Sequence, residues 1–293
     1  MRTQEPAVHS QPKAAKRGSG EKPGFFSSAE MLLVKKDMAA IWAQKSQRAL
    51  LMALPLTLAA VLPSVYFVAI SLLPVSMGAK LPQALLDILP DYVNTLDYRQ
   101  SWLVAFTDLL CPLLFLCVPI LTAAASASYA FVTERESGTL ESLLLTSVDV
   151  KAVFNAKVTS CTVLSAVISW LAFVIFSITA IVADVFAGVP LFFSFDWLLM
   201  ALLMAPALSL FSVVFVGFIV TRVHSTGESL QTMGYLILPV AVMFLVQFTG
   251  AFRLNLLALL LITLVLGVLD IILFNAAARA FTPEKLLEEK AEE

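Results

Sequence analysis

The sequence holds 293 residues, of which 59% are hydrophobic and only 14% charged, and its mean hydropathy is +0.89. This balance excludes an ordinary soluble domain, in which about a quarter of the residues carry charge. A formal net charge of −2 provides no basic surface for nucleic acid, so we expect no nucleic-acid partner. The composition indicates a membrane protein that contacts lipid.

The chain begins with a basic tail and continues into an amphipathic helix. Residues 1–26 are rich in Pro, Lys, Ser and Gly and lack an apolar stretch, which predicts a disordered cytoplasmic tail and no signal peptide. Ser27 and Glu30 have the spacing of a capping box, which starts a helix. We expect this helix to lie in the membrane interface, with Asp37 away from its apolar stripe. The stripe consists of Met31, Val34, Met38, Ile41 and Lys45.

Six apolar runs follow, and each meets or approaches the roughly 20 residues that one helical crossing needs. The runs are Ala49–Leu73, Asp108–Phe131, Val153–Ala183, Asp196–Val220, Gln231–Gly250 and Asn255–Asn275. The third is longer than one crossing requires. The predicted fold is therefore an all-α integral membrane protein, with a six-helix transmembrane domain over residues 27–280 and an acidic cytoplasmic tail over 281–293.

The distribution of Lys and Arg predicts the orientation. Sixteen of the 19 such residues fall on one side of the six predicted crossings, and nine of these lie in residues 1–48. Lys80, Arg99 and Arg253 fall on the other side. Because cytoplasmic loops carry the excess of positive charge, both termini are expected to be cytoplasmic, in a multi-pass protein of the inner or plasma membrane.

Prolines interrupt several of these runs. A proline removes one backbone hydrogen bond and tends to kink its helix, so their clustering favours a protein that flexes. The prolines are Pro55, Pro63, Pro112, Pro119, Pro206 and Pro239.

Several kinds of chemistry have no candidate residues. The two histidines, His9 and His224, cannot form a histidine-based metal cluster, and no phosphate-binding loop sequence occurs. The chain is therefore not expected to be an enzyme or to hold a cofactor of its own. Cys111, Cys117 and Cys161 all fall in apolar runs, where we expect them to be packing residues and not disulfides.

The most specific signal is a charged elbow (residues 134–146) between the second and third runs. A cluster of Glu, Arg and Glu cannot sit in hydrocarbon without a large penalty, so the elbow must face water. Its leucines recur at spacings of three and four, which gives a short helix one apolar face for a partner. The candidate coupling residues are Glu134, Arg135, Glu136, Gly138, Thr139, Leu140, Glu141, Leu143 and Leu144.

The elbow reads E-R-E-S-G-T-L-E-S-L-L-L-T and resembles the E-R-E-x-G-T-L-E-x-L-L-x-T segment of type 2 ABC exporter permeases (the ABC-2 permease family). The wider layout agrees with that family over residues 27–280. Ser147 departs from the pattern, because many relatives have proline there. The resemblance implies a permease subunit that pairs with a second copy or a close relative. It also implies that the elbow docks on a separate cytosolic ATPase, which binds the ATP and drives export.

One carboxylate, Asp270, lies well inside an apolar run. An ionisable residue at such a position is a functional candidate, and we expect it to be structural or to line a transport pathway. As a structural residue it would be hydrogen-bonded to a neighbouring Ser or Thr or paired with Arg279. An alternative function is an ion-coupled secondary transporter that uses Asp270. An intramembrane enzyme is a further alternative, but the crossings show no recognisable catalytic dyad. The low charge of the bundle favours amphipathic or hydrophobic cargo over a bare ion.

Overall fold

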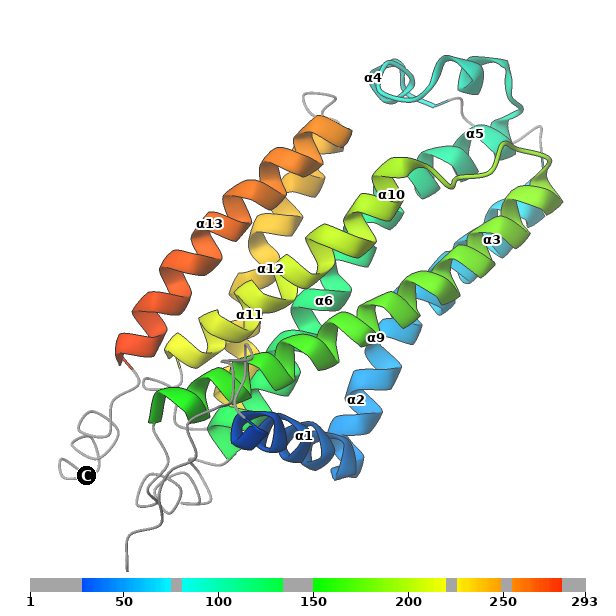
Figure 1. Cartoon of the computed structure of the whole chain (residues 1–293). Coiled ribbons are helices and arrows are strands. Elements are labelled where there is room, and N and C mark those ends of the chain that lie inside the picture. The colour runs from blue at the N-terminus through cyan, green and yellow to red at the C-terminus, as the bar shows by residue number, and fades with distance from the viewer. Residues whose placement is uncertain (1–27, 75–80, 134–149, 220–225, 249–254, 281–293) are drawn as a thin grey trace, which may run out of the picture.

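The computed structural model describes residues 28–74, 81–133, 150–219, 226–248 and 255–280, and every regular element in these ranges is a helix. The elements in chain order are α1 (Ser28–Ala43), α2 (Lys45–Leu56), η1 (Thr57–Val61), α3 (Leu62–Leu72), α4 (Gln83–Leu86), η3 (Asp91–Thr95), α5 (Tyr98–Ala105), η4 (Phe106–Leu110), α6 (Cys111–Ser128), η5 (Tyr129–Thr133), α9 (Val150–Ala187), α10 (Phe195–Leu199), η6 (Met200–Met204), α11 (Ala205–Ile219), α12 (Thr226–Phe248) and α13 (Leu256–Ala280). The helix α1 lies across the end of the bundle where α9 begins and α13 ends, whereas α4 and α5 lie at the opposite end (Figure 1).

Five helices of the described residues are long and apolar enough to cross a membrane, which confirms five of the six predicted runs. They are Lys45–Leu72, Tyr98–Phe131, Lys151–Ala187, Phe195–Ile219 and Leu256–Arg279. The apolar part of α12 is shorter, so a crossing at Gln231–Gly250 stays a prediction. With 38 residues, α9 is about 57 Å long, well beyond a hydrocarbon core of roughly 30 Å. These are the features of a helical multi-pass membrane protein.

Three of the prolines are accommodated by π-helical turns. The turns η1, η4 and η6 end two residues before Pro63, Pro112 and Pro206, respectively. A proline ring clashes with the carbonyl one turn earlier, and local widening of the helix relieves that clash. The widening leaves carbonyl groups without a partner on their own helix. In η6, the indole Nε1–H of Trp170 donates to the Ala201 oxygen at 2.8 Å, so a neighbouring helix supplies a donor at this widened turn.

The centre of the bundle is α6. Its apolar segment is 78% buried within the described structure, whereas that of α13 is only 11% buried. The helices α2, α9, α11 and α12 all pack against α6. Cys111 and Cys161 are buried and Cys117 is half-buried, and all three are free thiols, which confirms the prediction that they are packing residues.

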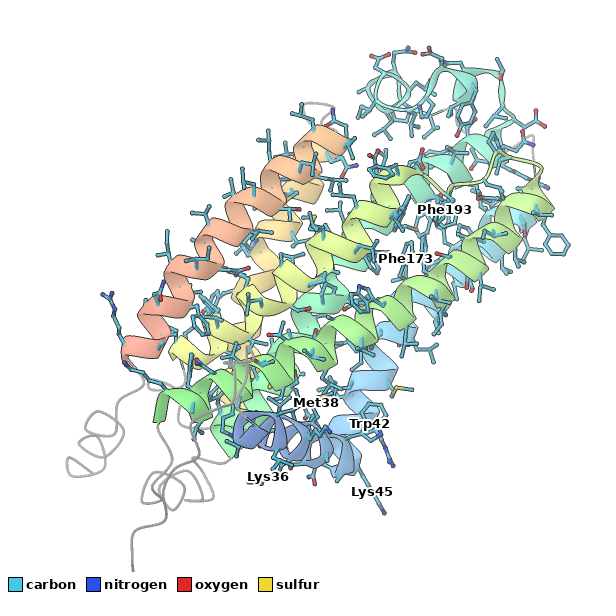
Figure 2. All side chains as sticks on the ribbon, viewed as in Figure 1. Lys36, Met38, Trp42, Lys45, Phe173 and Phe193 are labelled. Atoms are coloured by element: carbon cyan, nitrogen blue, oxygen red, sulfur yellow. The ribbon has the colours of Figure 1, made fainter. Side chains whose placement is uncertain are left out.

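The stripe predicted for α1 is wrong in one respect. The buried side chains are Asp37 and Ile41, whereas Met31 is 53% exposed. Met38 lies on the side of α1 that faces the bundle, and Lys36 lies on the side away from it (Figure 2). Because α1 packs on α9 and η5, its position is fixed by protein contacts that include an acidic residue. An interfacial location in the membrane remains a prediction.

The end of the bundle at α5 is held by side chains that cap two other helices. The C-terminus of α9 forms a Schellman motif, in which Gly188 adopts φ +69° and Val189 N–H donates to the Asp184 carbonyl at 3.1 Å. Gln100 Nε2 donates to the last carbonyl of α9, that of Ala187, at 2.9 Å. Arg99 Nε donates to the Leu73 carbonyl at the end of α3 at 2.7 Å. The helix α5 therefore fixes the ends of α3 and α9 relative to each other.

Candidate functional site

Three central helices are joined by buried hydroxyl groups. Ser165 on α9 donates to the Pro119 carbonyl on α6 at 3.0 Å. Its oxygen also lies 2.7 Å from Thr122 Oγ1 on α6 and 3.1 Å from Ser209 Oγ on α11. Thr122 and Ser209 also lie within hydrogen-bond distance of carbonyls of their own helices, so the three hydroxyls share these acceptors in one connected network. The contact links α6, α9 and α11 without a charged group.

A buried lysine lies where η5 meets the first turns of α9, next to the elbow, and we call this region the base. Lys157 is 1% exposed, and its Nζ donates to the Ala130 carbonyl at 3.0 Å. The same ammonium lies 5.9 Å from the centroid of the Phe131 ring, within the range of a cation–π contact. The Phe131 and Phe154 rings are also 5.9 Å apart. A lysine is almost never fully buried without partners, so these contacts hold the two helices together.

The predicted elbow lies outside the described residues, and so do the tails at 1–26 and 281–293. The described chain stops at Thr133, at the end of η5, and resumes at Val150, at the start of α9. The elbow positions without a structural description are Glu134, Arg135, Glu136, Gly138, Thr139, Leu140, Glu141, Leu143 and Leu144. The structure does describe the helix ends that flank them. There Lys157 on α9 donates to the Ala130 carbonyl in η5, and α1 packs against both α9 and η5.

A groove of about 650 Å³ lies between α9, α11 and α13, and Asp270 lines it. Asp270 is 3% exposed, and its Oδ1 has no hydrogen-bond partner in the described structure. Thr162 lines the same groove, and its Oγ1 is likewise buried without a partner. The groove therefore combines apolar walls with two polar atoms that no neighbouring group satisfies. We call it the Asp270 groove.

The expected structural role of Asp270 is not supported by these contacts. Its Oδ1 accepts no hydrogen bond from a Ser or Thr within the described ranges. Arg279 is nine residues further along α13, which is two and a half helical turns, or about 13 Å. It therefore projects from the opposite side of the helix and is exposed. The remaining expectation, that Asp270 lines a pathway, is compatible with its place in the groove.

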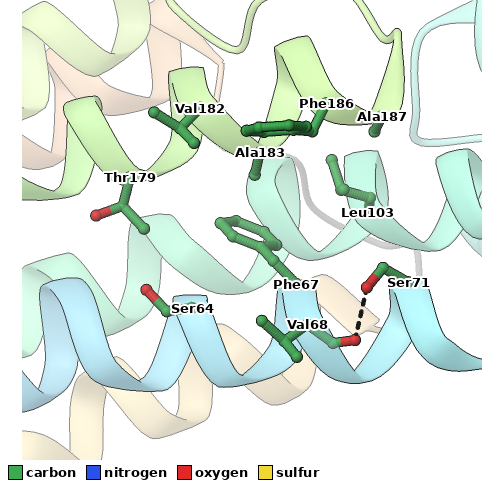
Figure 3. A pocket seen from close by; sticks show the side chains of 10 residues that line it. All are labelled: Ser64, Phe67, Val68, Ser71, Leu103, Thr179, Val182, Ala183, Phe186 and Ala187. Atoms are coloured by element: carbon green, nitrogen blue, oxygen red, sulfur yellow. Dashed lines mark hydrogen bonds between the residues drawn. The ribbon is translucent and has the colours of Figure 1, made fainter.

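A second groove, of about 480 Å³, lies between α3 and α9 (Figure 3). Ser71 and Thr179 line it, but each hydroxyl donates to a carbonyl of its own helix. The two distances are 2.8 Å to Val68 and 3.0 Å to Ile175. Phe67 and Phe186 also contribute to the walls. This α3–α9 groove offers apolar surface, and these two hydroxyls already have acceptors.

Sequence reasoning identified Asp270 but missed Lys157 and the hydroxyl contact at Ser165. One signal was available, because Ser165 and Ser169 recur at a spacing of four, as do Thr122 and Ser126. Such a spacing places each pair on one helix face. It does not say which helix lies opposite, and so it could not predict the contact. Within the described ranges, no three His, Cys, Asp or Glu residues are grouped to hold a metal ion.

Comparison of the chain with models of protein families, with curated proteins and with solved structures gives no match. The elbow sequence and the packing of the helices that flank it are therefore the features that point to a function.

Proposed function

We propose that this chain is the membrane subunit of an ATP-binding-cassette exporter, driven by a separate cytosolic ATPase that docks on the elbow. The observation that carries the proposal is the position of the elbow sequence. Its thirteen residues with the E-R-E-x-G-T-L-E pattern connect two membrane helices, of which α6 is the centre of the bundle and α9 is the longest. A segment in that position can pass a displacement directly to the helices around which the others pack.

The packing at the base of these helices supports the same proposal. Lys157 joins α9 to the last turns before the elbow, and Ser165 joins both helices to α11 further along. Buried contacts of this kind make the base a stiff unit, because packed interiors transmit strain and do not absorb it. A push on the elbow would then tilt α6, α9 and α11 together. A second permease copy or a close relative would complete the transporter.

An ion-coupled secondary transporter is the second candidate. The observation that favours it is the unpaired carboxylate of Asp270 inside the membrane-spanning part of α13. The two functions differ in their energy source. An exporter driven by ATP keeps transporting when an uncoupler collapses the ion gradient, whereas an ion-coupled carrier stops.

The test of the proposed function is a charge placed on the apolar face of the elbow. Leu143→Asp is expected to detach the ATPase, because a charge in a desolvated contact is strongly unfavourable. Glu134→Lys and Glu141→Lys reverse the charge pattern and are expected to weaken the same contact. The measurements are co-purification of an ATPase with the tagged chain and ATP-driven transport in reconstituted vesicles.

Ser142→Asp is the matched control, since position 142 falls opposite Leu140, Leu143 and Leu144 in the helix that we propose for the elbow. It introduces the same charge and is expected to leave ATPase binding intact. Normal ATPase binding and normal transport by the Leu143→Asp protein would refute the proposal, as would a wild-type chain that retains no ATPase.

A further inference from the structure

The Asp270 groove has a size and a shape that suit a small molecule. Its volume of about 650 Å³ falls within the roughly 300–1,000 Å³ typical of ligand pockets. Gly267 lies one turn before Asp270 and also lines the groove, and a Cβ at that position would meet no atom within 4 Å. The absence of a side chain there leaves open space beside the carboxylate.

The polar atoms in this groove are unsatisfied. An unpartnered carboxylate in an apolar environment is costly, and it must either hold a proton or gain a positively charged partner. Asp270 Oδ1 and Thr162 Oγ1 both lack partners, and they belong to different helices that face the same groove. No Lys or Arg is among the residues that line it. A positively charged partner for Asp270 would therefore come from outside the described fold.

The position of the groove defines the route by which a ligand would arrive. Asp270 lies ten residues before the end of α13, so it is about 15 Å from that end along the helix axis. Val163 and Ile271 form part of the walls and are 43% and 65% exposed. In a protein that crosses a membrane, such exposed apolar side chains on membrane helices face lipid unless a second protein covers them. The groove is therefore open from the hydrocarbon side.

We propose that the Asp270 groove binds an amphipathic amine that enters from the lipid. Its ammonium group donates to Asp270 and Thr162, and its apolar body lies along the walls that include Val163 and Ile271. A charge-assisted hydrogen bond to a buried carboxylate is among the stronger non-covalent contacts, which explains why a carboxylate occupies this position. The identification of this amine as cargo rests on the proposed exporter function, but its binding does not.

The test is equilibrium binding to the whole chain in lipid nanodiscs, with no ATPase present. The probe is a long-chain primary amine with a dansyl group at its far end, and its N-acetyl derivative is the uncharged comparison. Binding to empty nanodiscs is subtracted because both compounds partition into lipid. The amine is expected to bind saturably and the acetyl derivative to bind about tenfold more weakly or worse, since only the amine is charged.

Asp270→Asn is expected to weaken amine binding about tenfold and to leave binding of the acetyl derivative unchanged. Asp184→Asn is the matched control. Asp184 is a second buried aspartate on a membrane helix, but its Oδ2 already accepts the Phe192 N–H at 2.9 Å. It lies outside the groove, so this variant is expected to bind the amine normally. Equal affinity of the wild-type and Asp270→Asn chains would overturn the proposal.

Two further measurements keep the proposal testable if Asp270→Asn fails to fold. Thr162→Val keeps the shape of the side chain and is expected to weaken amine binding severalfold. A diazirine-bearing amine bound to the wild-type chain is expected to label peptides from α9 and α13 around the groove. Labelling confined to the α3–α9 groove would contradict the proposal.

The experiments also distinguish an amine from a second copy of the chain as the occupant of the Asp270 groove. If a second copy of the chain fills the groove with its own cationic residue, Asp270→Asn will lower the particle mass measured by mass photometry and the amine will not bind. That outcome would replace the ligand site with an interface. Loss of ATPase binding with intact amine binding would instead count against the proposed exporter function alone.

Discussion

At the centre of the bundle the Ser165 hydroxyl lies within hydrogen-bond distance of three groups on neighbouring helices, whereas at the α13 edge Asp270 Oδ1 has no partner within the described structure. Both groups are buried on membrane helices. The centre uses neutral hydroxyls that share neighbouring carbonyls, and this arrangement is favourable in hydrocarbon. The edge uses a carboxylate that the fold leaves unsatisfied.

This difference separates a structural polar contact from a functional one. A group whose partners come from the same chain contributes to the stability of that chain. A group that lacks partners lowers stability and is retained for another reason, often binding or catalysis. The comparison predicts opposite signs for the same kind of substitution, polar to apolar, at the two places.

The largest expected effect is at the centre. Ser165→Leu inserts extra carbon atoms where α6, α9 and α11 meet, and overpacking of this kind costs about 1–3 kcal/mol. Loss of the bond to the Pro119 carbonyl adds about 0.6 kcal/mol. The measurement is the free energy of unfolding of the purified chain, titrated with a denaturing detergent. Ser165→Ala, which loses the hydrogen bonds but adds no volume, should show only the smaller loss. Equal stability of the Leu variant and the wild type would mean that the three-helix contact does not exist.

The second effect concerns the base next to the elbow. Lys157→Met retains much of the side-chain length but removes the ammonium that bonds to the Ala130 carbonyl. A hydrogen bond from a charged donor is worth about 1.5–3 kcal/mol, so the thermal unfolding midpoint should fall clearly. Lys45→Met is the control, because Lys45 is exposed at the start of α2 and lies on the side of α1 and α2 away from the bundle (Figure 2). A similar midpoint for the two variants would contradict the role given to Lys157.

Lys157 also illustrates which features of the fold the sequence predicts and which it does not. The five described crossings, the length of α9 and the packing role of the cysteines follow from apolar run length, because a bilayer imposes that length directly. The burial of Lys157 and Asp37 does not follow from composition, since a charged residue near a helix end normally faces water. Their burial depends on α1 lying over α9, which is a tertiary contact between segments far apart in the sequence.

The prolines show the same limit on a smaller scale. Each could be expected to disturb its helix, but the form of the disturbance depends on a neighbour that accepts or donates a hydrogen bond. In η6 this neighbour is Trp170 of another helix, which donates to the Ala201 carbonyl. Asp270 was a candidate from sequence alone, yet its lack of a partner and the groove beside it needed the packed structure.

The third prediction is an increase in the free energy of unfolding, whereas the first two are decreases in stability. Asp270→Leu replaces an unpartnered carboxylate by an apolar side chain with the same branching, for which the groove and Gly267 leave space, and relief of the desolvation penalty should raise the free energy of unfolding by about 1 kcal/mol. The same variant should lose amine binding. A gain in stability with a loss of binding is the pattern expected of a functional group and not of a structural one. A marked loss of stability would show that Asp270 has a partner in the membrane, and the contrast with Ser165 would then fail.

The smallest effect comes from a matched pair of threonines on α9. Thr162 lines the Asp270 groove with a hydroxyl that lacks a partner, whereas Thr179 lines the α3–α9 groove and donates to the Ile175 carbonyl. A change to valine keeps the shape of each side chain and removes only the hydroxyl. Thr179→Val should therefore change the free energy of unfolding by no more than about 0.5 kcal/mol, since its back-bonded hydroxyl contributes little. Thr162→Val should be neutral or more stable than the wild type, because an unsatisfied buried oxygen is removed.

Parallel denaturant titrations of the two variants compare their free energies of unfolding for the same substitution on the same helix. If Thr162→Val were the less stable of the two, its hydroxyl would have to be satisfied in the membrane, and the Asp270 groove would lose one of its two polar contacts for a ligand.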